Sequence, residues 1–499
     1  MTELAFQSAG QLLDQMDAGT ITSRALLDLY LDRIERFDGR VNAVVALDIE
    51  RARERADHAD AARARGESWG PLHGLPITVK DCIETAGLRT TAGSERLATH
   101  VPERDATVVE RLTRAGAVIF GKTNTPEFAS DWQTSNTLHG TTNNPWDETR
   151  SPGGSSGGSA AAIAAGFTAL EIGSDIGGSI RIPAHCCGIF GHKPTWGIVP
   201  QRGHIPGLPG SRIENDLNVL GPLARSAGDL ELALDVLAGP NELDARGWHL
   251  ELPPARRDSL RDFRVAAWLD DPACSVDSEI RECLEQRVEQ LRKAGARVDD
   301  HARPACDFGE MVRIYQRLLA PIISTTFDDA QFAGFETAAR EQPAPEADAH
   351  SPFLRDLVET HHVWLSAHEA REGLRAVWDA FFRDYDVLLC PVSAVPAIPH
   401  DHSQPVTQRR LVVNGRKRPY MDQFGWMGPI GAMKLPATVA PAGRTAGGLP
   451  VGVQIVGAHL EDRTTLAFAR LFADEFGGFE NPPGFQDAGR EHPQAEVSV

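Results

Sequence analysis

Residues 151–184 hold the side chains that most clearly suggest chemistry. The stretch SPGGSSGGSAAAIAAGFTALEIGSDIGGSIRIPA contains six serines and no histidine. A serine nucleophile needs a base to take its proton, and that base is most often a histidine. A lysine can replace it when its amine is neutral, and burial favours that form because it disfavours the ammonium. The stretch therefore indicates serine chemistry with a base supplied from elsewhere in the chain.

Two lysines each lie at the end of a short apolar run and could supply that base. Lys80 ends the run LPITVK, and Lys122 follows the run AVIFG. Both runs are typical of buried strands, so both amines are candidates for a lowered pKa. The chemistry of the residues alone does not choose between them.

The second glycine cluster, GSDIGGS, follows a predicted strand and indicates the nucleophile. Glycine allows unusual backbone angles and a close approach to a ligand. Successive amides in this turn could point at one anion, as an oxyanion hole requires. Ser179 ends the turn and would lie beside those donors, which favours it over the other serines. The first cluster, around Ser155, is typical of a glycine loop that opens a small-residue helix and could deliver further hydroxyls.

Two other motifs match known patterns in the wrong context, and one group of histidines matches no known pattern. Residues 116–123 fit GxxxxGK[ST], but a helix precedes them and AVIF fills the loop positions, so we expect no phosphate site. Residues 153–157 fit GxSxG, but no strand leads into them, which argues against an α/β-hydrolase. His361, His362 and His368 share one predicted helix without a known metal motif, so we expect structural histidines and no metal.

Composition limits the partners. The 499 residues carry a net charge of −19, and an acidic surface repels phosphate backbones, so we expect no nucleic acid. The chain starts without a leader-like segment, and its most apolar stretch, 159–172, is too short to span a bilayer. Seven cysteines without CxxC spacing are typical of reduced, buried thiols. We expect a cytoplasmic protein with no membrane partner and no cofactor.

Alternating strand and helix patterns predict an α/β fold. Residues 5–65 read as helices, and predicted strands occur both before residue 200 and after residue 385. Strands on both sides of a helical segment indicate one discontinuous core. We therefore divide the chain into an N-terminal helical segment (1–70), a core (71–240), a mostly helical variable region (241–385), the rest of the core (386–480) and a tail (481–499). Residues 340–352 and the tail contain few large apolar side chains, so we expect mobility there.

These segments together resemble the amidase signature enzymes. GGSSGGSAAAIAAG followed by GSDIGGSIRIPAHCCGIFGHKPTWG is similar to the signature region of that family. The similarity extends to GLPITVKD, GKTNTPEF, NPWDETRSPGGSSGG, NVLGPLARSAGDL and LPVGVQIVG. The resemblance implies a mixed, twisted sheet of about eleven strands surrounded by helices.

The resemblance also implies a Ser–cis-Ser–Lys triad. Carried onto this sequence, Ser179 is the nucleophile, Ser155 the bridging serine and Lys80 the base, whereas Lys122 is not the base. The expected oxyanion donors are the backbone amides of Ile176, Gly177, Gly178 and Ser179. We expect Ser156 and Arg181 to support the site, with Asp175 pairing with Arg181. Ser174 stands where threonine is commoner in the family.

The predicted function is hydrolysis of a small or aryl amide through an acyl-enzyme. Lys80 takes a proton from Ser155, which takes one from Ser179. The same chemistry on a carbamate would make a urethanase, and on an ester an esterase. The expected partner is thus a small-molecule amide, carbamate or ester, and the expected state is a monomer or homodimer. The intact triad argues against a catalytically inactive scaffold.

The alternative is the catalytic subunit of a tRNA-dependent glutamine amidotransferase. Such subunits usually carry a GxEVKRRI-like stretch before the late strand, where this chain reads AHEAREGLRAVWDAFFRDYDVLLCPV. The pocket itself would come from variable residues, at about 200–240 and 300–435. We expect Trp132, Trp364 and Trp426 to be packed in the core rather than to line that pocket.

Overall fold

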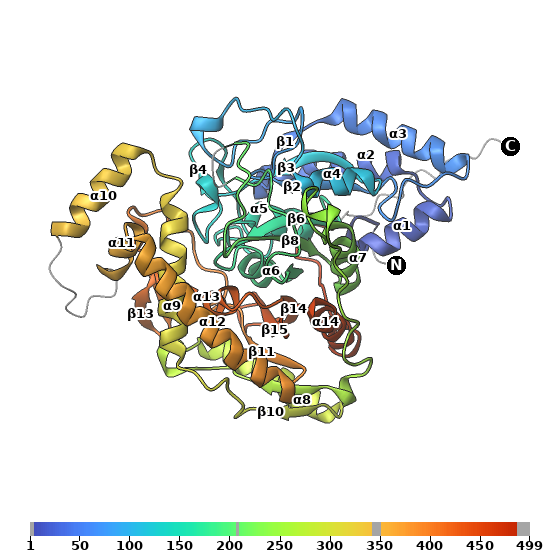
Figure 1. Cartoon of the computed structure of the whole chain (residues 1–499). Coiled ribbons are helices and arrows are strands. Elements are labelled where there is room, and N and C mark those ends of the chain that lie inside the picture. Colours follow the sequence, from blue (N-terminus) through green and yellow to red (C-terminus); the bar gives the residue numbers. More distant parts are fainter. Residues whose placement is uncertain (1–3, 206–208, 342–350, 487–499) are drawn as a thin grey trace.

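Short runs of β-branched and apolar residues form the strands of this protein. The computed structural model describes residues 4–205, 209–341 and 351–486. Within them, eleven strands form two sheets, accompanied by two short hairpins (Figure 1). The larger, eight-stranded sheet has the order β10 (Arg297–Asp299), β9 (Arg264–Ala267), β11 (Val387–Pro391), β15 (Pro450–Val456), β14 (Ala437–Arg444), β7 (Phe190–Lys193), β8 (Val219–Ala224) and β6 (Leu170–Asp175).

The smaller sheet carries the predicted base. Its order is β1 (Val44–Leu47), β3 (Val118–Thr123) and β2 (Pro76–Lys80). β2 packs beside β6 of the larger sheet without pairing with it. The two hairpins are β4–β5 (Ser135–Asn136, Gly140–Thr141) and β12–β13 (Arg410–Val413, Arg416–Pro419). The predicted α/β class with a mixed sheet is confirmed, but the eleven strands belong to two sheets rather than to one.

Helices cover both sheets (Figure 1). Those in the first half of the chain are α1 (Ala9–Asp17), α2 (Ser23–Val41), α3 (Ile49–Ala64), α4 (Thr107–Arg114), α5 (Gly157–Ala164), α6 (Arg181–Cys187) and α7 (Ala227–Leu237). The others are α8 (Ser278–Lys293), α9 (Phe308–Ser324), α10 (Asp329–Glu341), α11 (Ser351–Leu357), α12 (His361–Asp384), α13 (Phe424–Ala432) and α14 (Asp462–Phe476). No helix within the described ranges is long and apolar enough to cross a membrane.

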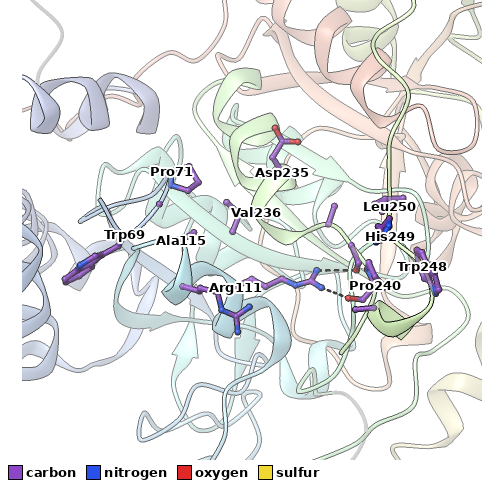
Figure 2. A pocket seen from close by; sticks show the side chains of 15 residues that line it. Trp69, Pro71, Arg111, Ala115, Asp235, Val236, Pro240, Trp248, His249 and Leu250 are labelled. Atoms are coloured by element: carbon purple, nitrogen blue, oxygen red, sulfur yellow. Dashed lines mark hydrogen bonds between the residues drawn. The ribbon is translucent and has the colours of Figure 1, made fainter. Parts of the chain in front are cut away.

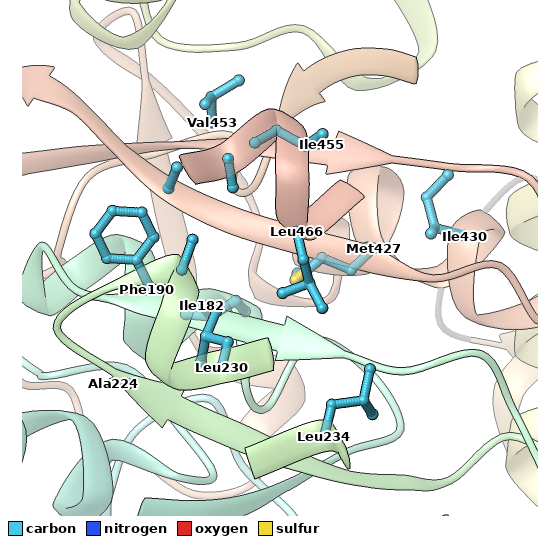
Figure 3. Close-up of a cluster of buried hydrophobic side chains, with 14 of the residues drawn as sticks. Ile182, Phe190, Ala224, Leu230, Leu234, Met427, Ile430, Val453, Ile455 and Leu466 are labelled. Atoms are coloured by element: carbon cyan, nitrogen blue, oxygen red, sulfur yellow. The ribbon is translucent and has the colours of Figure 1, made fainter. Parts of the chain in front are cut away.

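One hydrophobic core joins the early and late parts of the chain. Figure 3 shows Ile182 and Phe190 close to side chains of β15, α7 and α14, and all of these are buried. β7 pairs with β14, so residues before 200 and after 385 share one sheet. β9 and β10 also belong to that sheet, so the variable region supplies strands as well as helices. α5 packs against strands of both sheets and connects them near the predicted site.

The described part of the tail is packed onto the N-terminal helices. Phe485 is buried, and its carbonyl accepts a 2.7 Å hydrogen bond from Nη2 of the buried Arg33. The expectation that residues 481–499 fray is therefore wrong for this part, because one aromatic side chain anchors it. Residues 342–350 and 487–499, where mobility was also expected, lie outside the described residues.

Candidate active site

Strand β2 brings Lys80 to the centre of the molecule. The side chain is fully buried, and its Nζ lies 2.6 Å from Ser155 Oγ. Nζ also donates a 3.1 Å hydrogen bond to Ser174 Oγ on β6. Burial lowers the pKa of Lys80, although the nearby Cys82, Asp175 and Glu171 act in the opposite direction. The arrangement favours the neutral amine that a base requires.

Ser155 and Ser156 lie in the glycine turn that leads into α5. The Gly154–Ser155 peptide is cis, as the resemblance implies. Gly154 has no room for a side chain, since a Cβ there would lie 2.7 Å from the Asp131 carbonyl oxygen. The Ser156 amide donates a 3.1 Å hydrogen bond to the Ser179 carbonyl. This bond connects the segment of Ser155 to the segment of the predicted nucleophile.

A carboxylate organises the loop that precedes Ser179. Asp175 Oδ1 accepts hydrogen bonds from the Gly178 amide and from Arg181 Nη2, both at 2.9 Å. Arg181 Nη1 also donates a 2.7 Å bond to Gln454 Oε1 on β15. Burial alone would raise the pKa of Asp175, but the Arg181 charge and hydrogen bonds lower it to about 2. The predicted pairing of Asp175 with Arg181 is present in the structure.

Three amides of this loop remain available for an oxyanion. Within the described part of the chain, the N–H groups of Ile176, Gly177 and Ser179 have no hydrogen-bond acceptor. The expectation of four donors is wrong for Gly178, because the Asp175 carboxylate takes its N–H. A charged acceptor forms a stronger hydrogen bond than a neutral one, so this amide stays occupied.

Two aromatic side chains hold the carbonyl groups of the same loop. Tyr315 on α9 donates a 2.9 Å hydrogen bond to the Ile176 carbonyl, and Trp132 Nε1 donates a 2.8 Å bond to the Gly177 carbonyl. Because the carbonyl and N–H of a trans peptide point in opposite directions, the Tyr315 bond also orients the Gly177 amide. Tyr315 lies in the variable region, and no motif around it predicts this contact, so the sequence alone does not identify it.

Ser179 opens into a neutral, mostly apolar cavity of about 260 Å³. Its walls include Trp132, Phe424 and Leu319. No lysine, arginine or histidine is among the described residues that line it. The one carboxylate, Asp131, accepts a 2.5 Å bond from Arg409 and a 2.8 Å bond from the Tyr420 hydroxyl. The described wall therefore offers apolar surface, and its one carboxylate is already paired.

The three tryptophans named in the sequence differ in their surroundings. Trp132 is buried in the hydrophobic core and also lines the cavity, so its expected core packing is confirmed, whereas the expectation that it does not line the pocket is wrong. Trp426 is buried and packs against Trp268, with ring centroids 5.9 Å apart. Trp364 stacks on His361 at 5.8 Å, outside the cavity.

The rival motifs lie elsewhere. Lys122 is buried within β3, and its Nζ donates to the Ile83 carbonyl and, at 3.1 Å, to Thr85 Oγ1. Burial lowers its pKa to about 8, but no serine is among its partners in the described chain. The described residues contain no cluster of histidine, cysteine, aspartate and glutamate that could hold a metal.

A larger hollow of about 620 Å³ lies away from these residues. Figure 2 shows it between Trp69, Arg111 and Trp248, with none of the predicted triad in its wall. The Arg111 guanidinium is already occupied, because Nη2 donates a 2.6 Å bond to the Pro240 carbonyl. We therefore place the candidate site at Ser179.

The fold consists of two sheets around a buried lysine, with two serines on glycine-rich turns beside it. This arrangement defines an amidase-type hydrolase. The family model for amidases matches residues 25–466, and the chain belongs to the amidase family, whose members carry the amidase signature. The chain is 33% identical over 483 residues to the A subunit of glutamyl-tRNA(Gln) amidotransferase from Synechococcus sp. (strain CC9902), covering 92% of this chain and 94% of that protein.

Two further proteins have similar coverage. The protein of the same name from Anaeromyxobacter dehalogenans (strain 2CP-C) is 35% identical over 492 residues, covering 93% of this chain and 95% of that protein. A solved structure described as a crystal structure of amidase is 30% identical, with a TM-score of 0.76, covering 94% of this chain and all of that one (100%). The predicted family is confirmed.

Proposed function

We propose that this protein hydrolyses uncharged amides bearing an apolar or aryl group. The observation that carries the proposal is the buried amine of Lys80, 2.6 Å from Ser155 Oγ. A neutral amine at this distance can accept the Ser155 proton. The amide of the next residue, Ser156, donates a hydrogen bond to the Ser179 carbonyl. This bond holds the segment of Ser155 beside the segment of the nucleophile, so Ser155 can relay a proton between Ser179 and Lys80.

The proposed reaction proceeds through an acyl-enzyme. Lys80 accepts the hydroxyl proton of Ser155 while Ser155 accepts that of Ser179, and the Ser179 oxygen attacks the amide carbonyl. The amides of Ile176, Gly177 and Ser179 stabilise the resulting oxyanion. Collapse of this intermediate breaks the C–N bond, and the proton returns through Ser155 to the leaving nitrogen. Water then attacks the ester and releases the acid.

The two serine hydroxyls must turn toward each other for this relay. No hydrogen bond joins Ser179 Oγ to Ser155 Oγ among the described residues. Ser179 is 5% exposed, and its side chain borders the cavity. A rotation of this small side chain completes the relay when a substrate carbonyl is in place.

The lining of the cavity supports the proposed substrate class. Apolar side chains such as Leu319, Phe424 and Trp132 favour an alkyl or aryl group. A substrate carboxylate would lose its hydration there without gaining a cation, which costs several kcal/mol. Carbamates and esters with the same group could be attacked by Ser179 through the same route. We further propose that the protein acts without a nucleic acid or membrane partner, as a cytoplasmic monomer or homodimer.

The names of the relatives support a second candidate, the catalytic subunit of a glutamine amidotransferase. That role would require glutamine, whose α-carboxylate needs a cationic partner in a closed site. The described wall of the cavity offers none. The neutral cavity therefore favours the stand-alone hydrolase.

A substrate panel distinguishes the two candidates. Anilides, aliphatic amides, carbamates, p-nitrophenyl esters and glutamine are tested with the wild type and with Ser179→Ala. We expect turnover of neutral anilides, none of glutamine, and loss of both turnover and fluorophosphonate labelling in the variant. Ammonia release from glutamine, or purification with two partner subunits, would favour the amidotransferase instead.

A further inference from the structure

A line of buried polar side chains leads from the cavity wall to Lys80. Asn218 lines the cavity, and its Nδ2 lies 3.4 Å from His204 Nδ1. His204 Nε2 lies 3.5 Å from Cys82 Sγ, which lies 4.0 Å from Ser174 Oγ. Ser174 Oγ in turn accepts the 3.1 Å bond from Lys80 Nζ. We call these four residues, Asn218, His204, Cys82 and Ser174, the His204 line.

A backbone amide fixes the direction of donation in this line. The Asn215 N–H donates a 3.1 Å bond to Gln201 Oε1, so that atom is an oxygen. The same oxygen lies 3.0 Å from Asn218 Nδ2, which is therefore the nitrogen of that amide. Asn218 must then donate to His204 Nδ1, because an amide nitrogen has no acceptor capacity.

The tautomer of His204 follows from that direction. Burial, with a smaller contribution from the charge of Lys80, lowers the pKa of His204 to about 3. A neutral imidazole that accepts at Nδ1 carries its proton on Nε2. His204 Nε2–H therefore donates to Cys82 Sγ, and the thiol cannot donate back to it.

The thiol proton then has one acceptor left. Burial raises the pKa of Cys82, so it stays a thiol, and Ser174 Oγ is its remaining acceptor within the described residues. Ser174 Oγ also receives an N–H of Lys80. A neutral lysine held in this way keeps its lone pair for Ser155, 2.6 Å away.

We propose that His204 is a positioning residue that acts through Cys82 and Ser174 to orient the Lys80 amine toward Ser155. The inference rests on the proposed function, since it assigns Lys80 as the base. It also connects the base to the substrate, because the line begins at Asn218 in the cavity wall. His204 touches neither the nucleophile nor the cavity, so its effect is on rate rather than on binding.

Single and double variants test the line. His204→Leu and Cys82→Ala should each lower kcat about ten- to a hundredfold with KM unchanged, because a misdirected base slows proton transfer without altering the cavity. The double variant should be no slower than the slower single variant, since either change breaks the same line. His204→Gln should keep most activity, because its amide can still donate to the sulfur.

A matched control is Cys186→Ala, another buried thiol, 5% exposed, outside the line. It should leave kcat unchanged. Should His204→Leu fail to fold, Cys82→Ala carries the same prediction with a smaller change. Multiplicative losses in the double variant, equal losses in His204→Gln and His204→Leu, or an equal loss in Cys186→Ala would each overturn the proposal.

The rate of fluorophosphonate labelling separates this inference from the proposed substrate. Labelling reports the reactivity of Ser179 and needs no amide substrate. A wild type that is labelled but hydrolyses no anilide would refute the substrate class, and the variants would still be ranked by labelling rate. A wild type that is neither labelled nor active would refute both.

Discussion

Lys80 and Lys122 lie on neighbouring strands and point to opposite faces of one sheet. In the parallel pairing of β2 with β3, Lys122 lies opposite Val79 and Lys80 lies opposite Thr123. Successive side chains on a strand alternate between faces, so an offset of one residue separates the two amines. Lys80 faces Ser155 and Ser174, and Lys122 faces the Ile83 carbonyl and Thr85.

Because of this offset, we expect substitution of Lys80 to reduce activity and substitution of Lys122 to reduce stability. Lys80→Met should lower kcat by at least about a hundredfold, because general-base catalysis is lost, with little change in unfolding temperature. Lys122→Met should keep the base but lower the free energy of unfolding by about 1–3 kcal/mol, because the buried Ile83 carbonyl loses its donor. Kinetics and urea unfolding of both variants check this. Equal kinetic losses would contradict the assignment of Lys80 alone.

The pH dependence of kcat/KM should follow the protonation of Lys80. Burial lowers the pKa of Lys80 below its ordinary value of 10.5, and only the neutral amine accepts a proton. We therefore expect kcat/KM to fall as pH drops through that lowered pKa and to level off above it. Steady-state rates across the pH range in which the fold is stable provide the measurement. A profile that stays flat far into acid would remove Lys80 as the base.

The ionised Asp175 carboxylate, which holds the oxyanion loop, should make the free energy of unfolding depend on pH in the acid range. Its pKa of about 2 lies below the ordinary 3.8, so its contribution of about 2 kcal/mol is present above pH 4 and is lost as pH falls toward 2. Asp175→Asn should cost about 3–5 kcal/mol at neutral pH, because Arg181 is left buried and unpaired. Urea unfolding should show this difference shrinking between pH 4 and pH 2. A difference that is constant with pH would refute the pairing as its source.

Charge in the cavity should control the substrate class. Ile323, at the end of α9, lines the cavity and is partly exposed. Ile323→Arg should lower KM for an anilide that carries a terminal carboxylate and raise KM for its neutral analogue. Ile323→Met, which keeps the cavity neutral, is the matched control. An unchanged preference in the arginine variant would mean that substrates bind elsewhere.

Apolar spacing and capping residues identify many of the helices, because neighbouring residues largely determine where a helix forms and begins. The apolar residues of 462–476 recur at the 3.6-residue spacing of a helix and form α14, and Ser8 and Thr22, residue types that favour helix N-termini, cap α1 and α2. Strand β1, Val44–Leu47, was missed because its four residues lie between two long helices and are paired only with a distant partner, β3.

The sequence predicts those residues of the candidate site that lie close together in the chain, but not the contacts that depend on distant segments. The glycine clusters place Ser155, Ser179 and the loop amides through local turns. The choice between Lys80 and Lys122 depends on strand register, which the residues alone do not reveal. The Gly178 amide was expected to be free because its acceptor, the Asp175 side chain, is oriented by Arg181 and, through it, by Gln454 far along the chain.

That last contact has a consequence for synthesis on the ribosome. Asp175 and Arg181 emerge early, but Gln454 on β15 emerges near the end, as does β14, the neighbour of β7. A nascent chain that lacks these two strands already contains Lys80, Ser155 and Ser179 without the support of their loop. We therefore expect a chain that ends before β14 to lack the Gln454 contact that holds Arg181, so that the loop of Ser179 gains its full support only when translation is nearly finished.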